Sequence, residues 1–253
     1  MEHSERPSLD LAKTTLPLPL FEAIERIFST YSEGCCLVGG TALAGFYAGH
    51  RRSDDLDLFT RDDFSQQATI AAVVSLTNWG VTISGQRESP QHFRCLAEDR
   101  GHRFTIDVVL DSHFHAFSIF QTQIENIRIA TLRGLLAMKI ATLVSRCSEK
   151  DLYDLMWLFK HYQKPSFSEF ASVGKQIDAG VSDESILISL SGSTLQESAC
   201  HFAEPMGVDA STVLENIEHF KMELIHDYSA YLKNTDQNLP LKVVLDKLRG
   251  PKR

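Results

Sequence analysis

Hydrophobic and polar residues follow two different periods along this chain, and the change comes near residue 130. Before it, residues 20–31 carry apolar side chains on one helical face, whereas several later runs alternate as strands do. The strand-like runs are residues 35–38, 56–59, 81–86, 92–97, 104–110 and 127–130. After residue 131 the spacing is helical, first over 132–144 and then over 150–161. We therefore expect an α+β protein, with a mixed α/β domain over residues 1–130 and an all-helical domain over residues 131–253.

Residues 37–59 contain two strands joined by a glycine turn, a short apolar helix and a basic linker. The second strand carries Asp55 and Asp57, and alternation places both carboxylates on one face while Leu56 and Leu58 point into the core. Two neighbouring carboxylates repel each other unless a cation lies between them. Oxygen ligands of this kind suit a divalent metal such as Mg²⁺.

The turn before the short helix reads Gly39, Gly40, Thr41. Backbone N–H groups at a helix N-terminus have no partner within the helix and favour an anion such as a phosphate. Arg51 and Ser53, just before the aspartate pair, can both donate to phosphate oxygens. The alternative for these two residues is a polar loop that covers the start of the strand. A metal beside a phosphate site indicates phosphoryl or nucleotidyl transfer.

A third carboxylate lies in the strand-like run RFTIDVVLD, where Asp107 faces away from the apolar side chains. A carboxylate in the middle of a strand needs a partner or solvent. If this strand lies beside residues 56–59, Asp55, Asp57 and Asp107 converge into a cluster that can hold two magnesium ions. The alternative is an exposed aspartate on an edge strand.

The helical half contains a second group of charged residues. One interpretation is an uninterrupted helix that brings Lys139, Arg146, Lys150 and Asp154 to one side, with Asp151 close by. The other is that Ser148 caps a new helix, with Asp151 at the capping-box partner position. In both cases Lys150 and Asp154 can pair, and an exposed ion pair of little energetic value is the simpler explanation of that spacing.

The formal net charge of −8 argues against a protein that coats nucleic acid, but it does not exclude one local basic groove. Five cysteines without metal-ligand spacing favour a reduced, cytoplasmic protein. No apolar run approaches the roughly 20 residues that a membrane span needs, so we expect no membrane association. We expect His113 and His115 to be surface residues, and Trp79 and Trp157 to pack in the core.

Three motifs together resemble a known family. Residues 39–43 read Gly-Gly-Thr-Ala-Leu, residues 51–59 read Arg-Arg-Ser-Asp-Asp-Leu-Asp-Leu-Phe, and residues 146–155 read Arg-Cys-Ser-Glu-Lys-Asp-Leu-Tyr-Asp-Leu. This order resembles the AbiEii/AbiGii toxin family of nucleotidyltransferases, within the DNA polymerase β-like nucleotidyltransferase superfamily. The superfamily often has serine after the first glycine, whereas this chain has Gly40 followed by Thr41.

The resemblance implies a nucleotidyltransferase-like mixed β-sheet flanked by helices and followed by a helical domain. It also implies a bacterial toxin of a toxin–antitoxin or phage-defence pair, with a separately encoded antitoxin. Such an enzyme moves a nucleotide from an NTP to an acceptor, in some members the 3′ end of tRNA. By position, the catalytic and metal-binding residues are Asp55, Asp57 and Asp107. The implied nucleotide-binding residues are Gly39, Gly40, Thr41, Arg51, Ser53, Lys150, Asp151 and Asp154.

Two other functions fit the same residues. One is a non-catalytic module that binds RNA or a partner protein and uses the acidic cluster structurally. The other is an enzyme of the same fold that nucleotidylates protein hydroxyl groups. An RNA acceptor is the first choice by analogy with the family alone.

Overall fold

The computed structural model describes residues 5–235, and the chain separates into two compact units, Met1–Leu135 and Leu136–Arg253. The division falls inside one helix, α6 (Leu132–Ser145). Residues 1–4 of the predicted α/β domain and residues 236–253 of the predicted helical domain lie outside the described residues. The predicted fold class, a mixed sheet with flanking helices followed by helices, is confirmed.

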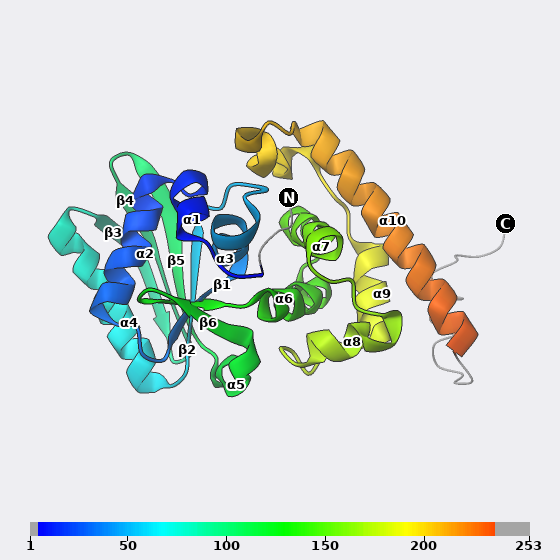
Figure 1. The fold of residues 1–253 in the computed structure, drawn as a ribbon, viewed down its shortest axis with the longest axis horizontal. Coiled ribbons are helices and arrows are strands. Elements are labelled where there is room, and N and C mark those ends of the chain that lie inside the picture. Colours follow the sequence, from blue (N-terminus) through cyan, green and yellow to red (C-terminus); the bar gives the residue numbers. More distant parts are fainter. Residues whose placement is uncertain (1–4, 236–253) are drawn as a thin grey trace. The chain divides into compact units, whose positions relative to one another are not determined.

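The described part of the first unit is built on a seven-stranded sheet in the order β3-β4-β5-β2-β1-β7-β6 (Figure 1). The strands are β1 (Cys35–Val38), β2 (Asp55–Thr60), β3 (Thr82–Ser89), β4 (His92–Asp99), β5 (His102–Leu110), β6 (Gln121–Ile124) and β7 (Ile127–Ala130). The β2–β5 and β1–β7 pairs are parallel and the other neighbours are antiparallel. The sequence predicted all of these strands except β6.

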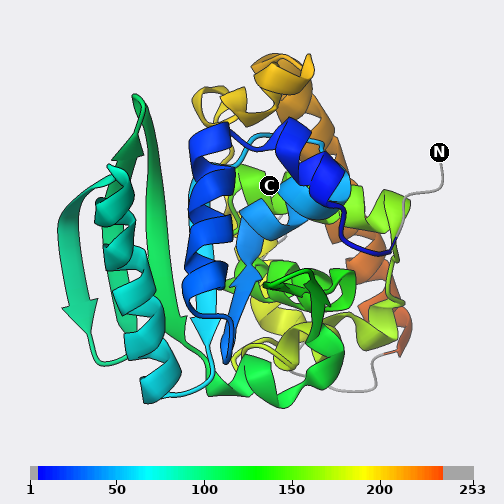
Figure 2. The ribbon, with the colours of Figure 1, turned by 60° about the vertical axis from the view of Figure 1, so that its left-hand side comes forward.

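Two helices, α2 (Leu18–Thr30) and α4 (Asp63–Ser75), contact each other and strands of the sheet (Figure 2). The buried face of α2 carries Leu20, Ile24 and Ile27, the helical spacing seen in the sequence. Asp62 caps α4, since its side chain accepts a hydrogen bond from the backbone N–H of Ser65. The helix α1 (Leu9–Thr15) precedes α2 and contacts the short π-helix η1 (Ala44–Ala48).

The predicted hairpin at residues 98–101 joins β4 to β5. Its two turn residues, Arg100 and Gly101, have φ values of 49° and 77°. A two-residue turn with both φ values positive matches the right-handed twist of the strands it connects. This hairpin places β4 beside β5, and therefore beside Asp107.

The predictions for isolated aromatic and histidine residues had mixed outcomes. Trp157 is buried as expected, but Trp79 is 64% exposed, so its predicted core packing is wrong. Trp79 ends the short helix η2 (Leu76–Trp79), where its ring lies 5.0 Å from the Arg26 guanidinium and covers a charged side chain. His113 is exposed, whereas His115 is half-buried and its Nε2 lies 3.0 Å from the carbonyl oxygen of Phe59.

The second unit is helical throughout its described part. After α6 come α7 (Glu149–His161), α8 (Phe167–Lys175), α9 (Asp183–Gly192), η4 (Glu197–Ala199), η5 (His201–Met206) and α10 (Ala210–Thr235). The long helix α10 packs against α7 and α9, and the fully buried Tyr228 of α10 donates a hydrogen bond to Asp183. None of the helices in residues 5–235 has both the length and the apolar content needed to cross a bilayer.

Candidate functional site

The pairing of β2 with β5 brings two of the predicted aspartates to the same level of the sheet. These strands run parallel, and Asp57 lies opposite Asp107 while Asp55 lies opposite Thr105. Neighbouring strands are about 4.8 Å apart, and all three aspartates share the half-buried face of their strands. The expected adjacency of the two strands is therefore confirmed.

Gly39 lies against the side chain of Asp57. The glycine follows Val38, the residue opposite Asp57 on β1, and it turns the chain into α3 (Gly39–Leu43) with a φ of 70°. A Cβ atom at this position would lie 2.1 Å from Asp57 Oδ2. Glycine is required here for two reasons, because the backbone is left-handed and the carboxylate fills the space of a side chain.

The other predicted phosphate-binding residues gather at the start of the same helix. A Cβ on Gly40 would lie 2.4 Å from an Arg51 Nη atom and 3.1 Å from Ser53 Oγ. Thr41 Oγ1 lies 3.0 Å from Ser53 Oγ, and the Thr41 hydroxyl donates to the backbone carbonyl of Asp55. The structure thus joins the glycine turn, the basic linker and the first aspartate through direct contacts.

Arg51 is only 2% exposed, which is unusual for an arginine. One of its Nη atoms donates to the backbone carbonyl of Arg52 at 2.9 Å. Arg52 itself is more exposed and pairs with Asp54 at 3.0 Å, as expected for a polar loop. Arg51 therefore supplies a buried positive charge beside the glycine turn.

Asp55 and Asp107 each bind a neighbouring side chain. Thr105 donates a hydrogen bond of 2.7 Å to Asp55 Oδ1. His92 Nε2 lies 2.6 Å from Asp107 Oδ1, and an Nη atom of Arg94 lies 3.8 Å from the same oxygen. The sequence analysis did not assign His92 and Arg94 to the site. The signal was the alternation in β4, which puts both on one face, but their position beside Asp107 requires the β4–β5 pairing.

The carboxylate oxygens of Asp55, Asp57 and Asp107 fit a hard divalent cation, because Mg²⁺ prefers such ligands. Within residues 5–235, however, no group of three or more His, Cys, Asp or Glu side chains is arranged to hold a metal ion. The three aspartates share one face, where Thr105 donates a hydrogen bond to Asp55 and His92 contacts Asp107. Their role as metal ligands remains a prediction.

The charged residues of the second unit form a buried network. Lys139 of α6 places its Nζ 2.9 Å from Asp151 Oδ1 and 2.7 Å from Asp154 Oδ2, both on α7. The side chains of Asp151 and Asp154 are 0% exposed and that of Lys139 is 5% exposed. The simpler expectation of an exposed ion pair is therefore wrong for Asp154. The partner is on the preceding helix, and burial makes the interaction much stronger than it would be in water.

Asp151 also binds the segment between the two helices. Ser148 caps α7, as one of the two sequence interpretations proposed, and the uninterrupted helix is wrong. The Ser148 hydroxyl and Arg146 Nε both lie 2.6 Å from Asp151 Oδ2. Burial raises the pKa of Asp151, but the charges of Lys139 and Arg146 outweigh burial, so the pKa lies well below its usual value. Lys150 is half-buried in the first turn of α7.

Solved structures of other proteins share the fold of this chain. A protein from Helicobacter pylori described as a nucleotidyltransferase is 16% identical over 88% of this chain and 98% of its own, with a TM-score of 0.53. JHP933, also from H. pylori, is 17% identical over 90% of this chain and 97% of its own, with a TM-score of 0.53. MenT4, a nucleotidyltransferase toxin from Mycobacterium tuberculosis, is 15% identical over 96% of this chain and 97% of its own, with a TM-score of 0.50.

At these identities the solved structures establish a common fold and nothing more. A search of curated proteins found no match. The family profile described as "Nucleotidyl transferase AbiEii toxin, Type IV TA system" matches residues 22–241, which span both units. The chain therefore belongs to the AbiEii nucleotidyltransferase toxin family of type IV toxin–antitoxin systems.

Proposed function

We propose that this nucleotidyltransferase is magnesium-dependent and transfers a nucleotide from an NTP to an RNA acceptor, the 3′ end of a tRNA. The observation that carries the proposal is the register of β2 and β5, which sets Asp57 opposite Asp107 and beside the Gly39 turn. The Asp57 carboxylate lies beside Gly39, the first residue of α3. Family membership also implies an NTP substrate and an antitoxin.

In the proposed reaction, the acceptor hydroxyl oxygen attacks the α-phosphorus of the NTP. The bond from that phosphorus to the bridging oxygen breaks, and pyrophosphate leaves. Asp107 takes the proton of the attacking hydroxyl, and His92, which contacts Asp107 at 2.6 Å, orients that carboxylate. Asp55, Asp57 and Asp107 would hold Mg²⁺, which supplies positive charge that offsets the negative charge developing on the phosphate oxygens.

The glycine turn binds the triphosphate in this proposal. The backbone N–H groups of Gly39, Gly40 and Thr41 donate to phosphate oxygens, and the Ser53 hydroxyl adds a further donor. Arg51 is buried behind Gly40, so it raises the local positive potential and holds the turn in place. Because the Arg51 guanidinium is already held in place, it does not have to reorient as negative charge develops on the phosphate.

The motif on α7 divides into two roles. Asp151 and Asp154 are fully buried against Lys139, which supports the role of holding α6 and α7 together. Lys150 is half-buried in the first turn of α7, and its role in nucleotide binding stays a prediction that rests on the family resemblance.

The test is transfer of label from each α-³²P NTP to total bacterial RNA in the presence of Mg²⁺. We expect labelled RNA of tRNA size with the wild-type protein. Asp57→Ala should lower the rate by roughly a hundredfold or more, because it removes a charge that acts on the reacting phosphate. The matched control is Asp63→Ala, which removes an exposed carboxylate from α4 of the same unit.

Three results bear on separate parts of the proposal. Equal labelling by the wild-type protein and Asp57→Ala would contradict the assigned site. Labelling that persists when EDTA replaces Mg²⁺ would contradict the metal requirement. Label in a protein band, with none in RNA, would show that the acceptor is a protein hydroxyl.

A further inference from the structure

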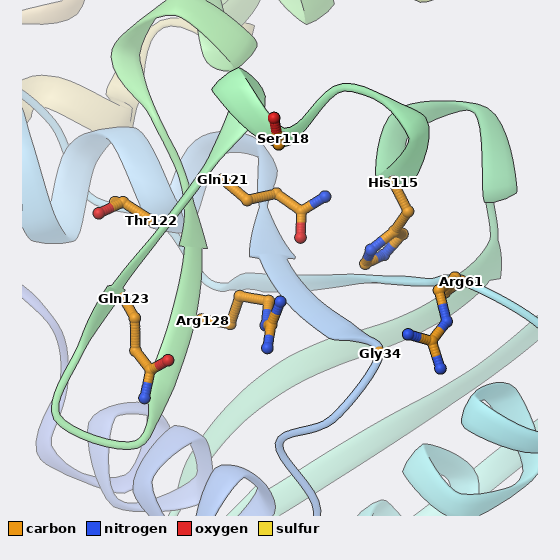
Figure 3. A pocket seen from close by; sticks show the side chains of 8 residues that line it. All are labelled: Gly34, Arg61, His115, Ser118, Gln121, Thr122, Gln123 and Arg128. Carbon is orange, nitrogen blue, oxygen red and sulfur yellow. The ribbon is translucent and has the colours of Figure 1, made fainter.

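A pocket of about 340 Å³ lies in the first unit, at the opposite end of β1 and β2 from the aspartates (Figure 3). Gly34 precedes β1 and Arg61 follows β2, whereas Gly39 follows β1 at its other end. Gly34 and Gly39 are five residues apart, and at about 3.3 Å per residue the two ends are separated by roughly 16 Å. The pocket is lined by Gly34, Arg61, His115, Ser118, Gln121, Thr122, Gln123 and Arg128. It is therefore distinct from the glycine turn.

The side chains of Arg61, His115 and Arg128 point toward a common space in this pocket (Figure 3). They come from three separate segments, the end of β2, the helix α5 (Ser112–Ala116) and strand β7. Burial lowers the pKa of His115, and the charges of Arg128 and Arg61 lower it further, whereas the hydrogen bond with the Phe59 carbonyl and the charge of Asp111 act in the opposite direction. No carboxylate from the described residues lines the pocket.

Arg128 has an unsatisfied buried atom. Its Nε is buried without a hydrogen-bond partner, and no salt bridge or side-chain hydrogen bond of Arg128 occurs within residues 5–235. Arg61 pairs through its Nε with Asp62 at 3.1 Å, which is not among the lining residues. Buried polar groups are nearly always hydrogen-bonded, and an arginine fork suits an oxoanion. An anion between the two arginines would satisfy these donors.

We propose that this pocket is a second ligand site, which binds the phosphoryl group of a small phosphorylated molecule between Arg61 and Arg128. The amide of Gln121 points into the same space and offers a further donor, and Ser118 adds a hydroxyl group to the lining (Figure 3). Among the described residues that line the pocket, His115 is the one aromatic ring on which a base could stack. The volume suits a small molecule. We therefore expect the phosphoryl group, rather than a base, to supply most of the contacts with the ligand.

The test is isothermal titration of the full-length protein with inorganic phosphate and with AMP, in EDTA to remove divalent cations. We expect saturable binding by the wild-type protein. Arg128→Gln should weaken it about tenfold or more, because the variant loses charge-assisted hydrogen bonds. The matched control is Arg87→Gln, which removes an exposed arginine from β3 of the same unit and should change binding less than about twofold. Thermal unfolding of both variants establishes that they are folded.

The two probes separate the sources of the phosphoryl group. If inorganic phosphate and AMP bind with similar affinity, and Arg128→Gln weakens the binding of both, the site binds phosphate itself. Binding of AMP alone with the same sensitivity supports a nucleotide as the ligand. If neither probe binds, or if Arg128→Gln and Arg87→Gln weaken binding equally, the pocket is not a phosphoryl site.

Discussion

Removing Lys139 should destabilise the second unit strongly. Lys139 Nζ lies 2.9 Å from Asp151 and 2.7 Å from Asp154, and Arg146 also pairs with Asp151. Lys139→Met keeps the length of the side chain but removes the positive charge that contacts both carboxylates, whose side chains are 0% exposed. Breaking a buried ion pair in this way costs about 3–5 kcal/mol, because the remaining charge cannot return to water.

The measurement is urea unfolding followed by tryptophan fluorescence. The protein has two tryptophans, and Trp157 lies buried in α7 of the second unit, whereas Trp79 is exposed in the first. A Trp79→Phe background therefore leaves Trp157 as the reporter for the unit that contains Lys139. The matched control is Lys175→Met, an exposed lysine in the last turn of α8, which should change the free energy of unfolding by less than about 0.5 kcal/mol.

The effect should also depend on pH in a known direction. The folded pKa of Asp151 lies below its unfolded value of 3.8, so the stability it contributes is present above that value and is lost as pH falls through the folded pKa. The difference between the wild-type protein and Lys139→Met should therefore be largest near neutral pH and should narrow on acidification. A loss below about 1 kcal/mol at neutral pH, or a loss equal to that of Lys175→Met, would refute the reasoning.

Three further predictions concern the first unit. Gly39→Ala should abolish nucleotidyl transfer and lower stability by about 1–3 kcal/mol, because its Cβ would overlap Asp57; a fully active, stable variant in the RNA-labelling and unfolding assays would contradict this. His92→Gln should lower kcat in the RNA-labelling assay about tenfold or more, because Asp107 loses a contact of 2.6 Å; an unchanged kcat would show that the contact does not affect catalysis. Burial raises the pKa of Cys35 to about 12, so iodoacetamide near pH 8 should label this thiol only after unfolding. Mass spectrometry that finds Cys35 labelled in the native protein would contradict this prediction.

Local patterns predicted the elements of the site. A period of two residues placed Asp55 and Asp57 on one face, and the Gly39 turn marked the start of a helix after a buried strand. Both features depend on residues that are close in sequence, so periodicity and backbone preference are enough to find them. The same holds for the helical half, where Ser148 marked the start of α7.

Which strands lie side by side, and which side chains therefore meet, depends on contacts between distant parts of the chain. Asp57 and Asp107 are fifty residues apart in sequence and meet only because β2 and β5 pair in parallel, with that register. His92 reaches Asp107 through the adjacent strand β4, and no local pattern identifies that partner. Strand alternation specifies which face a side chain occupies, but it does not specify which strand lies next to it.

Burial was likewise decided by the tertiary structure. A charged residue at helical spacing looks the same in the sequence whether it is exposed or buried, and only the packing of α6 on α7 encloses Lys139 between Asp151 and Asp154. The cationic pocket around Arg128 also needs three separate segments to come together. The sequence by itself therefore determined the elements and the chemistry of their side chains. The tertiary structure decided which charges meet and which are shielded from water, because both depend on distances in space that local periodicity does not encode.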